Sequence, residues 1–524
     1  MLVMKLNILS IFVLIFAQNV DSARILCFYP TPSKSGVLIA QPLMEELAKR
    51  GHEVTFVSPF PLGKSVPNYR DVVISVKNEA TRELTQRVTS KEQKHNILTW
   101  LPKLVTLSSE ATIEVIKDEK FQEIMKKEKF DLIVFGYLFN NFQLGLQEHF
   151  NCSSVVLSSA PFFHFLEELL GHPNNPEAVR SIMLKKDEEM TGMNFFERVL
   201  NTLAYFVEHL MFIYVEYRNQ FYFDEIFPES KLGYSNAKKN VSLVLVNQYL
   251  SEGWIRPLLP SVIEVGGLQI KETPSPLPDD IQKFIESSKD GVVLVSFGTN
   301  FRSIDLQQEK LSILMKSFSK LEQKVIWKFE NETLPNLPKN VLIKTWLPQD
   351  DILAHPNTKA FVTHCGISSY NEALFHAVPI VAIPFVSDQP MNAKRAKDAG
   401  WAEIVPFLEL TEEKLDAALT EILKNPKFKK NVKVLSDKYR DRPITAMQSA
   451  IYWIEYVIRH EGAPQLRYPG INLNYFQQRG LDIFAFLTLF LFVLVKGTKF
   501  VCQKLRNCTK KGVDNRKRHD KKNN

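Results

Sequence analysis

Polar side chains suited to binding an anion lie close together in the second half of the chain. Residues 359–363 predict a buried strand that ends at His364, and residues 366–376 predict a helix. The hydroxyls of Ser368 and Ser369 would then stand at the N-terminus of this helix. That end of a helix carries unpaired N–H groups and the positive end of the helix dipole, so it favours a phosphate or diphosphate.

Other residues in the same half could bind the rest of a nucleotide sugar. Thr299 follows a predicted strand and offers a second loop with the same chemistry, and Trp346 offers a flat surface for a base. Glu372 could accept hydrogen bonds from ribose hydroxyls, and Asp388 and Gln389 could bind a sugar. Taken singly, each of these residues has an ordinary structural explanation: packing for Trp346, a helix cap for the two serines, and a turn for Asp388 and Gln389. Only their ordered combination favours a nucleotide sugar.

An α/β fold must position these side chains. Short apolar runs alternate with helical patterns on both sides of a segment with Pro274, Pro276 and Pro278, which stops regular structure. The alternation is typical of doubly wound parallel sheets, so we expect two Rossmann-like lobes with a ligand in the cleft between them. The expected strands are 24–29, 53–57, 130–135 and 155–158 in the first lobe, and 291–297, 325–329, 341–345, 359–363 and 379–383 in the second.

Two further segments of the first lobe are expected to be helical. Residues 36–50 predict the helix that follows the first strand. Residues 166–222 are rich in Phe, Tyr, Met and Leu with charges between them, which predicts amphipathic helices. Three roles stay open for these helices: they line an apolar acceptor pocket, they lie on a membrane face, or they merely cover the sheet.

The composition is globular, with little net charge on the body. The 524 residues carry a net charge of +7, and 45% of them are hydrophobic. Eleven Lys or Arg and two Asp lie from residue 496 onward, so that segment carries +9 and the rest carries −2. Nucleic-acid binding by the body is therefore not expected. The five cysteines exclude a disulfide scaffold, and their spacing predicts no metal site.

Both ends of the chain carry membrane-related patterns. Residues 1–22 predict a cleaved secretory signal, with an uncleaved anchor as the alternative. The apolar run 483–495, extended to 481–502, predicts a membrane span, with a buried or interfacial helix as the alternative. The basic residues after this run place the tail in the cytosol and the body in the lumen.

Short motifs agree with this topology. Lys521 and Lys522 resemble the dilysine retrieval signal of ER membrane proteins. Asn151, Asn240 and Asn331 match the N-glycosylation pattern on the lumenal side, whereas Asn507 matches it on the cytosolic side and is expected to stay unmodified. The predicted location is the ER membrane, in a single-pass type I orientation.

The stretch FVTHCGISSYNEALFHAVPIVAIPFVSDQPMNA, together with Trp346 and Gln349, resembles the signature of the UDP-glycosyltransferases. The resemblance covers the whole chain, and the segments PSKS and EELAKRGHEVT look like the insect members. It implies a GT-B fold of two Rossmann-like lobes facing a cleft, plus a C-terminal transmembrane helix. It also implies inverting, metal-independent transfer of a hexose, for which the insect-like flanks favour UDP-glucose over UDP-glucuronate.

The resemblance further implies partners, domains and residue roles. The partners would be a UDP-sugar, a small lipophilic acceptor and the ER membrane, without a cofactor, and a homo-oligomer is compatible with the sequence. The implied domains are a signal peptide at 1–22, an acceptor lobe at 23–270, a linker at 271–284, a donor lobe at 285–465, a membrane helix at 481–502 and a tail at 503–524. Trp346 would stack on uracil, Gln349 would contact the nucleoside, and Glu372 would hold the ribose. The diphosphate would be bound by His364, Gly366, Ser369 and Thr299, and the sugar by Asp388 and Gln389.

Two positions depart from the family's pattern. The family's general base is a His in the first loop of the first lobe, where insect-like members read Ser-Lys-Ser-His and this chain reads Ser33-Lys34-Ser35-Gly36. The carboxylate that orients this base follows a later strand, where this chain has Gly136. A positioned base is worth about 10²–10⁴-fold, and glycine supplies none.

Three explanations are open for the missing base. The enzyme could act on amines, acidic phenols or activated carbons, which need little base catalysis. Another group, such as His149, His164 or His172, could substitute. Alternatively, the protein could bind UDP-sugar or a partner without turnover. A nicotinamide-dependent oxidoreductase is disfavoured because the first loop lacks GxGxxG.

Overall fold

The computed structural model describes residues 22–76, 97–181, 183–184, 192–251 and 255–520. All of the predicted signal peptide except Ser22 lies outside the described residues, as do Lys521 and Lys522. The described chain divides into two compact units. The first comprises residues up to 170 and 174–467, and the second comprises residues 171–173 and 468 onward.

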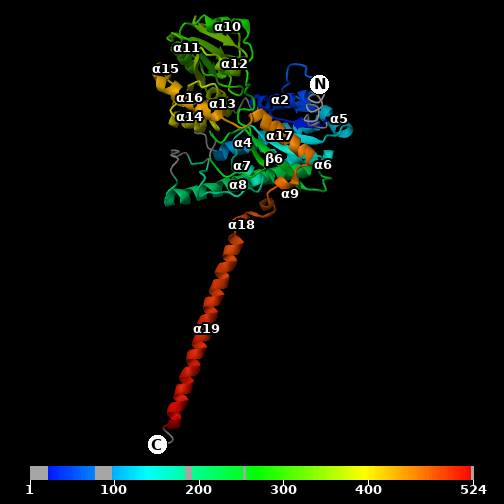
Figure 1. The fold of residues 1–524 in the computed structure, drawn as a ribbon, viewed down its shortest axis with the longest axis vertical. Helices are drawn as coiled ribbons and strands as arrows, with labels where there is room; N and C mark the ends of the chain where they lie inside the picture. Colours follow the sequence, from blue (N-terminus) through cyan, green and yellow to red (C-terminus); the bar gives the residue numbers. More distant parts are fainter. Residues whose placement is uncertain (1–21, 77–96, 182, 185–191, 252–254, 521–524) are drawn as a thin grey trace, which may run out of the picture. The chain divides into compact units, whose positions relative to one another are not determined.

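Two parallel sheets form the core of the first unit (Figure 1). The first sheet has the order β3-β2-β1-β4-β5-β6-β7 and the second has the order β10-β9-β8-β11-β12-β13. The strands of the first sheet are β1 (Arg24–Phe28), β2 (Glu53–Ser58), β3 (Tyr69–Val73), β4 (Leu132–Tyr137), β5 (Ser153–Ser158), β6 (Val241–Val246) and β7 (Val262–Glu264). Those of the second are β8 (Val292–Ser296), β9 (Lys324–Lys328), β10 (Val341–Lys344), β11 (Thr358–Thr363), β12 (Ile380–Ala382) and β13 (Ala402–Ile404).

The predicted strands are confirmed to within a few residues at each end, because central parallel strands are buried on both faces and read as continuous apolar runs. All residues of β4 and β8 are buried, for example. Both sheets are parallel throughout, as the alternation predicted. Strands β3, β6, β7 and β13 were not predicted; all residues of β6 are buried, whereas β3, β7 and β13 include partly exposed residues.

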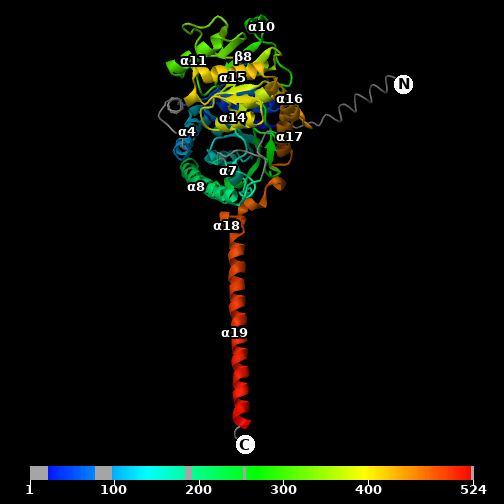
Figure 2. The same ribbon diagram turned by 90° about the vertical axis from the view of Figure 1, so that its left-hand side faces the viewer.

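Helices connect the strands (Figures 1 and 2). In the first lobe these are α2 (Lys34–Lys49), α4 (Ile97–Lys117), α5 (Glu119–Lys127), α6 (Gly145–Phe150), α7 (His164–Leu169), α8 (Phe195–Ile226) and α9 (Tyr234–Lys239). After them come α10 (Asp279–Glu286), α11 (Gln308–Ser319), α12 (Gln349–Ala354), α13 (Ile367–Phe375), α14 (Gln389–Asp398), α15 (Glu412–Lys424), α16 (Pro426–Arg440) and α17 (Ala446–Arg459). Helix α2 confirms the helix predicted at 36–50, and α13 confirms the one predicted at 366–376.

Two elements lie differently from the expected domain boundaries. Helix α10 occupies the second half of the predicted linker, because Ile281 and Ile285 bury its apolar face in the core of the second lobe. Helix α17 was assigned to the donor lobe, but Ala450 and Ile454 pack it into the core of the first sheet beside α2. The chain therefore returns to the first lobe after the second lobe is complete.

Helix α8 accounts for the amphipathic pattern in the middle of the chain. One side packs on the first lobe through residues such as Phe212, Val215 and Phe223. The other side exposes large apolar side chains, among them Phe196 (76%) and Tyr217 (70%). Covering the sheet explains only the first side, so the acceptor-pocket and membrane-face interpretations stay predictions for the second.

The second unit contains α18 (Tyr475–Gln478) and the long helix α19 (Leu481–Asp520). Residues 481–509 of α19 form the one helix among the described residues that is long and apolar enough to cross a membrane. The expected apolar helix at 481–502 is therefore present, and it continues without a break into the basic tail.

Candidate active site

The residues singled out by the sequence lie at the carboxyl ends of central strands. In the first sheet the strand order reverses at β1, which pairs with β2 on one side and with β4 on the other. In the second sheet it reverses at β8, which pairs with β9 and β11. Ligands of open α/β sheets bind outside the carboxyl ends of the strands at such a reversal. The loops that follow β8 and β11 carry Thr299 and His364. The loop that follows β1 carries the first-loop residues, and Gly136 lies near the end of β4.

Gln349, Ser369 and Glu372 form one hydrogen-bonded set between α12 and α13. The Gln349 side chain donates to Glu372 Oε2 over 2.7 Å and to Ser369 Oγ over 3.1 Å. Gln269 donates to Glu372 Oε1 over 3.3 Å and to the Ser368 carbonyl over 3.4 Å. Burial and the nearby Asp350 raise the pKa of Glu372 to about 7. The set therefore holds one carboxylate in a fixed place, ready to accept hydroxyl groups.

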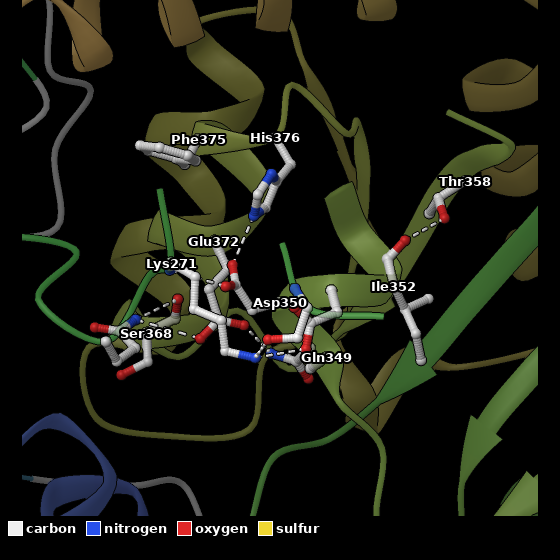
Figure 3. Close-up of polar contacts among 12 residues, drawn as sticks. Lys271, Gln349, Asp350, Ile352, Thr358, Ser368, Glu372, Phe375 and His376 are labelled. Carbon is white, nitrogen blue, oxygen red and sulfur yellow. Dashed lines mark hydrogen bonds and ion pairs between the residues drawn. The ribbon is translucent and has the colours of Figure 1, made fainter. Parts of the chain in front are cut away.

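Contacts to Asp350 and Asp351 hold α12 in place (Figure 3). His376, just past the end of α13, lies with Nε2 2.6 Å from Asp350 Oδ1, and the Lys271 amide donates to Asp350 Oδ2 over 3.0 Å. The Lys271 ammonium also contacts Asp351 over 2.6 Å. These contacts fix the helix that presents Gln349, and neither Gln269 nor Lys271 carried a signal in the sequence.

His364 is wedged between two glycines. A Cβ at Gly298 would lie 2.7 Å from the imidazole, and one at Gly366 would lie 2.6 Å from it, so only glycine fits at either position. Burial and the nearby Lys328 lower the pKa of His364 to about 4, and the ring is therefore neutral at pH 7. Thr299, one residue after Gly298, has a buried hydroxyl without a hydrogen-bond partner among the described residues. A phosphate oxygen is the kind of acceptor that this hydroxyl lacks.

Asp388 and Gln389 already make hydrogen bonds inside the protein. Asp388 Oδ2 accepts from the Ile367 amide over 3.2 Å at the start of α13 and from Asn392 over 2.7 Å. Gln389 Oε1 accepts from the amides of Phe385 and Val386 over 2.9 and 3.1 Å. Asp388 is thus brought to the N-terminus of α13, and the side-chain oxygen of Gln389 is used inside the protein.

Trp346 is half-exposed, and the side chain of Lys34 in the first loop lies over its ring. The Lys34 ammonium lies 4.0 Å from the centre of the Trp346 ring, a cation–π contact. Ser33 Oγ, next to it, donates to Asn300 Oδ1 over 3.1 Å. Burial and Lys328 lower the pKa of the Lys34 ammonium. No sequence pattern indicated that Lys34 lies beside the donor-site residues, although Lys34 lies two positions before Gly36.

The two glycines at the positions of the missing base and carboxylate line one small pocket. The pocket has a volume of about 50 Å³, and both Gly36 and Gly136 line it with Tyr29 and Ser159. A Cβ at Gly136 would lie 2.6 Å from the Tyr29 ring, and one at Gly36 would lie 3.3 Å from it. The Tyr29 ring therefore occupies the space between the two positions, where an imidazole and a carboxylate would have to meet.

Neither Tyr29 nor the three candidate histidines has the features of a general base in this pocket. Burial raises the pKa of Tyr29, so the phenol stays protonated at neutral pH. No histidine is among the described residues that line the pocket. The His149 ring contacts the Met125 carbonyl, the His172 ring contacts the Pro173 carbonyl, and His164 is buried beside glutamates. Substitution by one of these histidines therefore has no support in the geometry.

Comparison with known proteins agrees with these observations. A model of the family described as "UDP-glucoronosyl and UDP-glucosyl transferase" matches residues 29–518. The chain belongs to the UDP-glycosyltransferase family. It is 31% identical to UDP-glycosyltransferase UGT5 of Dactylopius coccus, over 92% of this chain and 91% of that protein. It is 30% identical to UDP-glucuronosyltransferase 1A7 of Rattus norvegicus, over 88% and 89% of the two chains.

Solved structures show the same architecture. A glycosyltransferase of kitacinnamycin superposes with a TM-score of 0.54 at 17% identity, over 84% of this chain and all of that one. The spinosyn forosaminyltransferase SpnP superposes with a TM-score of 0.53 at 15% identity, over 83% and 99% of the two chains. This UDP-glycosyltransferase has the GT-B fold, as expected from its sequence. The apolar helix α19 follows the two lobes.

Proposed function

We propose that this UDP-glycosyltransferase transfers a hexose, with inversion, from UDP-glucose to small lipophilic acceptors that need little base catalysis. One observation carries the acceptor class: the Tyr29 ring fills the space between Gly36 and Gly136. An alcohol must lose a proton as it attacks, whereas a neutral amine attacks first and an acidic phenol ionises without help. Amines and acidic phenols are therefore the preferred acceptors.

The donor-site contacts support the binding half of this proposal. Trp346 stacks on uracil once Lys34 moves aside, and Gln349 and Glu372 bind the nucleoside and the ribose. The diphosphate lies at the N-terminus of α13, with Thr299, His364, Gly366 and Ser369 around it. Asp388 and the amide nitrogen of Gln389 bind the sugar. The leaving UDP is stabilised by the helix dipole and by oriented donors rather than by a resident metal.

The test is a transfer assay on microsomes that contain the full chain. Labelled UDP-glucose and UDP-glucuronate are offered with amines, acidic phenols and unactivated alcohols. We expect product from UDP-glucose with amines and acidic phenols, and a rate at least tenfold lower with alcohols, since a base is worth about 10²–10⁴-fold. Equal rates on all three acceptor classes would contradict the proposed acceptor class, and product from UDP-glucuronate alone would contradict the proposed donor.

The alternative function is binding of UDP-sugar or of a partner without turnover. The Tyr29 ring favours this alternative as well. The ring fills the space where the family's base and its carboxylate would lie, which is compatible with an inactive protein. Equilibrium binding of labelled UDP-glucose separates the two functions. Binding without product for any acceptor supports the alternative, whereas product supports the enzyme. If the chain binds neither donor, the proposed roles of Trp346 and Glu372 are wrong.

We further propose that the protein resides in the ER membrane as a type I single-pass protein with a lumenal body. The signal at residues 1–22, the apolar part of α19, the basic tail and the dilysine pair support this orientation. Glycans are proposed at Asn151 and Asn331, which are exposed, and at Asn240, whose side chain is partly buried and accepts from Arg467 over 3.2 Å. A homo-oligomer stays compatible with this arrangement.

Protease added to sealed microsomes is expected to remove only the tail after about residue 502, because the bilayer shields the body. Antibodies against an epitope at each end of the chain would follow the cleavage on gels. Detergent added before the protease is the control, and it should expose the whole chain. Protection of the tail in sealed vesicles would refute the orientation.

A further inference from the structure

Two helices of the first lobe bring two histidines and a glutamate together away from the donor-site residues. Helix α7 supplies His164 and Glu168, which are four residues apart and so share one face of the helix. Helix α8 supplies His209. The two helices contact one another and lie side by side in both ribbon views (Figures 1 and 2). One potential ligand atom from each of the three residues lies within 4.8 Å of the other two.

The separations match the ligand shell of a small transition-metal ion. Glu168 Oε1 lies 3.5 Å from His164 Nε2 and 3.4 Å from His209 Nδ1. Charge-assisted hydrogen bonds would be shorter, at about 2.7–2.9 Å. In a tetrahedral zinc site with bonds of about 2.0–2.1 Å, neighbouring ligand atoms lie about 3.3–3.4 Å apart. Two of the three separations between the potential ligand atoms therefore already match such a site.

The surroundings of His164 resemble the outer shell of a metal site. The side chain of His164 is 1% exposed, and neither ring nitrogen has a hydrogen-bond partner among the described residues. Its Nδ1 faces Glu167 Oε2 over 3.5 Å, and Arg256 holds the other oxygen of Glu167 over 2.6 Å. Histidine ligands of metals usually direct their second nitrogen at a carboxylate in this way. Asn174 similarly donates to Glu168 over 3.1 Å and orients that carboxylate.

The charges of these side chains also favour a divalent cation. Glu167 and Glu208 are almost fully buried, and the side chain of Glu168 is 10% exposed. Glu167 pairs with the guanidinium of Arg256, whose side chain is 3% exposed. Buried charges are costly unless they are paired or bind a metal. A divalent ion beside Glu168 would lower the cost of burying this carboxylate.

We propose that His164, Glu168 and His209 bind a zinc-class ion that ties α7 to α8. Imidazole nitrogens with one carboxylate suit zinc and related transition metals, whereas magnesium and calcium prefer oxygen ligands. The site is separate from the donor-binding residues, and the proposal does not depend on sugar transfer. The loop before α7 carries Ser159 of the small pocket, so a fixed α7 also fixes one wall of that pocket.

The test measures metal content and thermal unfolding of the full chain in detergent, purified through a tag without histidine. We expect about one zinc per chain after dialysis against metal-free buffer. Chelation should lower the unfolding temperature by several degrees, and zinc chloride, but not magnesium chloride, should restore it. Less than a tenth of an equivalent of zinc, together with no zinc-specific shift, would overturn the proposal.

Three variants sharpen this experiment. Glu168→Gln removes a ligand and should abolish the zinc-specific shift. Glu167→Gln alters only the outer shell and should weaken zinc binding about 10–100-fold. His149→Gln is the matched control, because His149 is exposed and contacts a backbone carbonyl, and it should retain the metal. If His149→Gln lost as much zinc as Glu168→Gln, the assigned ligands would be wrong. If Glu168→Gln failed to fold, the wild-type chain and Glu167→Gln would still decide the question.

Discussion

A Tyr29→Ala, Gly36→His, Gly136→Asp variant is expected to glycosylate an unactivated alcohol about 10²–10⁴-fold faster than the wild-type chain. The three positions line one pocket, and removal of the Tyr29 ring makes room for an imidazole and the carboxylate that orients it. The alcohol oxygen then attacks the anomeric carbon, its proton passes to the imidazole, and the bond to UDP breaks. Initial rates with UDP-glucose and a simple alcohol measure the gain.

Simpler variants separate the causes of this gain. Gly136→Asp alone should destabilise the protein, because its Cβ would lie 2.6 Å from the Tyr29 ring. Gly36→His alone meets the ring at 3.3 Å and should fold, but it should gain little because the two catalytic groups act as a unit. Amine acceptors should respond less than alcohols. If the wild-type chain already uses alcohols at the rate of the triple variant, the base lies elsewhere.

Glu372→Ala is expected to weaken UDP binding about 10²–10⁴-fold. Hydrogen bonds to a charged group are worth about 1.5–3 kcal/mol each, and a ribose offers two hydroxyls to this carboxylate. The change also removes the 2.7 Å contact that the Gln349 side chain makes with Glu372. Equilibrium binding of UDP measures the loss. Glu403→Gln, which alters an ion pair with Lys397, is the matched control and should bind UDP normally. Equal affinities of Glu372→Ala and wild type would refute the ribose role.

The pH dependence of binding gives an independent check of the same residue. Since the pKa of Glu372 is raised to about 7, its carboxylate is mostly protonated at pH 6 and mostly ionised at pH 8. The ionised form is the better acceptor for hydroxyls, so UDP affinity should fall up to about tenfold from pH 8 to pH 6. Glu372→Gln has no such proton and should lose this dependence. Because the pKa of Glu372 is raised from 4.5 to about 7 in the folded protein, this residue also makes the protein lose stability as the pH rises through that window.

The sequence alone determined the parallel sheets, the order of the lobes and the family. Central strands such as β8 are buried on both faces and must be apolar throughout, so they stand out without any knowledge of the fold. The donor-site motif from His364 to Gln389 is local, because one strand, one helix and the next loop supply it. Its residues could therefore be named from their spacing, and the apolar part of α19 was visible for the same reason.

Only the tertiary structure decided which distant residues meet. Tyr29 and Gly136 are far apart in the chain, and it is the pairing of β1 with β4 that brings the Tyr29 ring into the space beside Gly136. His209 joins His164 and Glu168 only because α8 packs on α7, so no local spacing of these three residues indicates a metal site. Lys34 covers Trp346, and α17 packs beside α2, through contacts between segments that no local pattern connects. Local patterns specify strands and helices, whereas the packing of whole elements decides which side chains share a pocket.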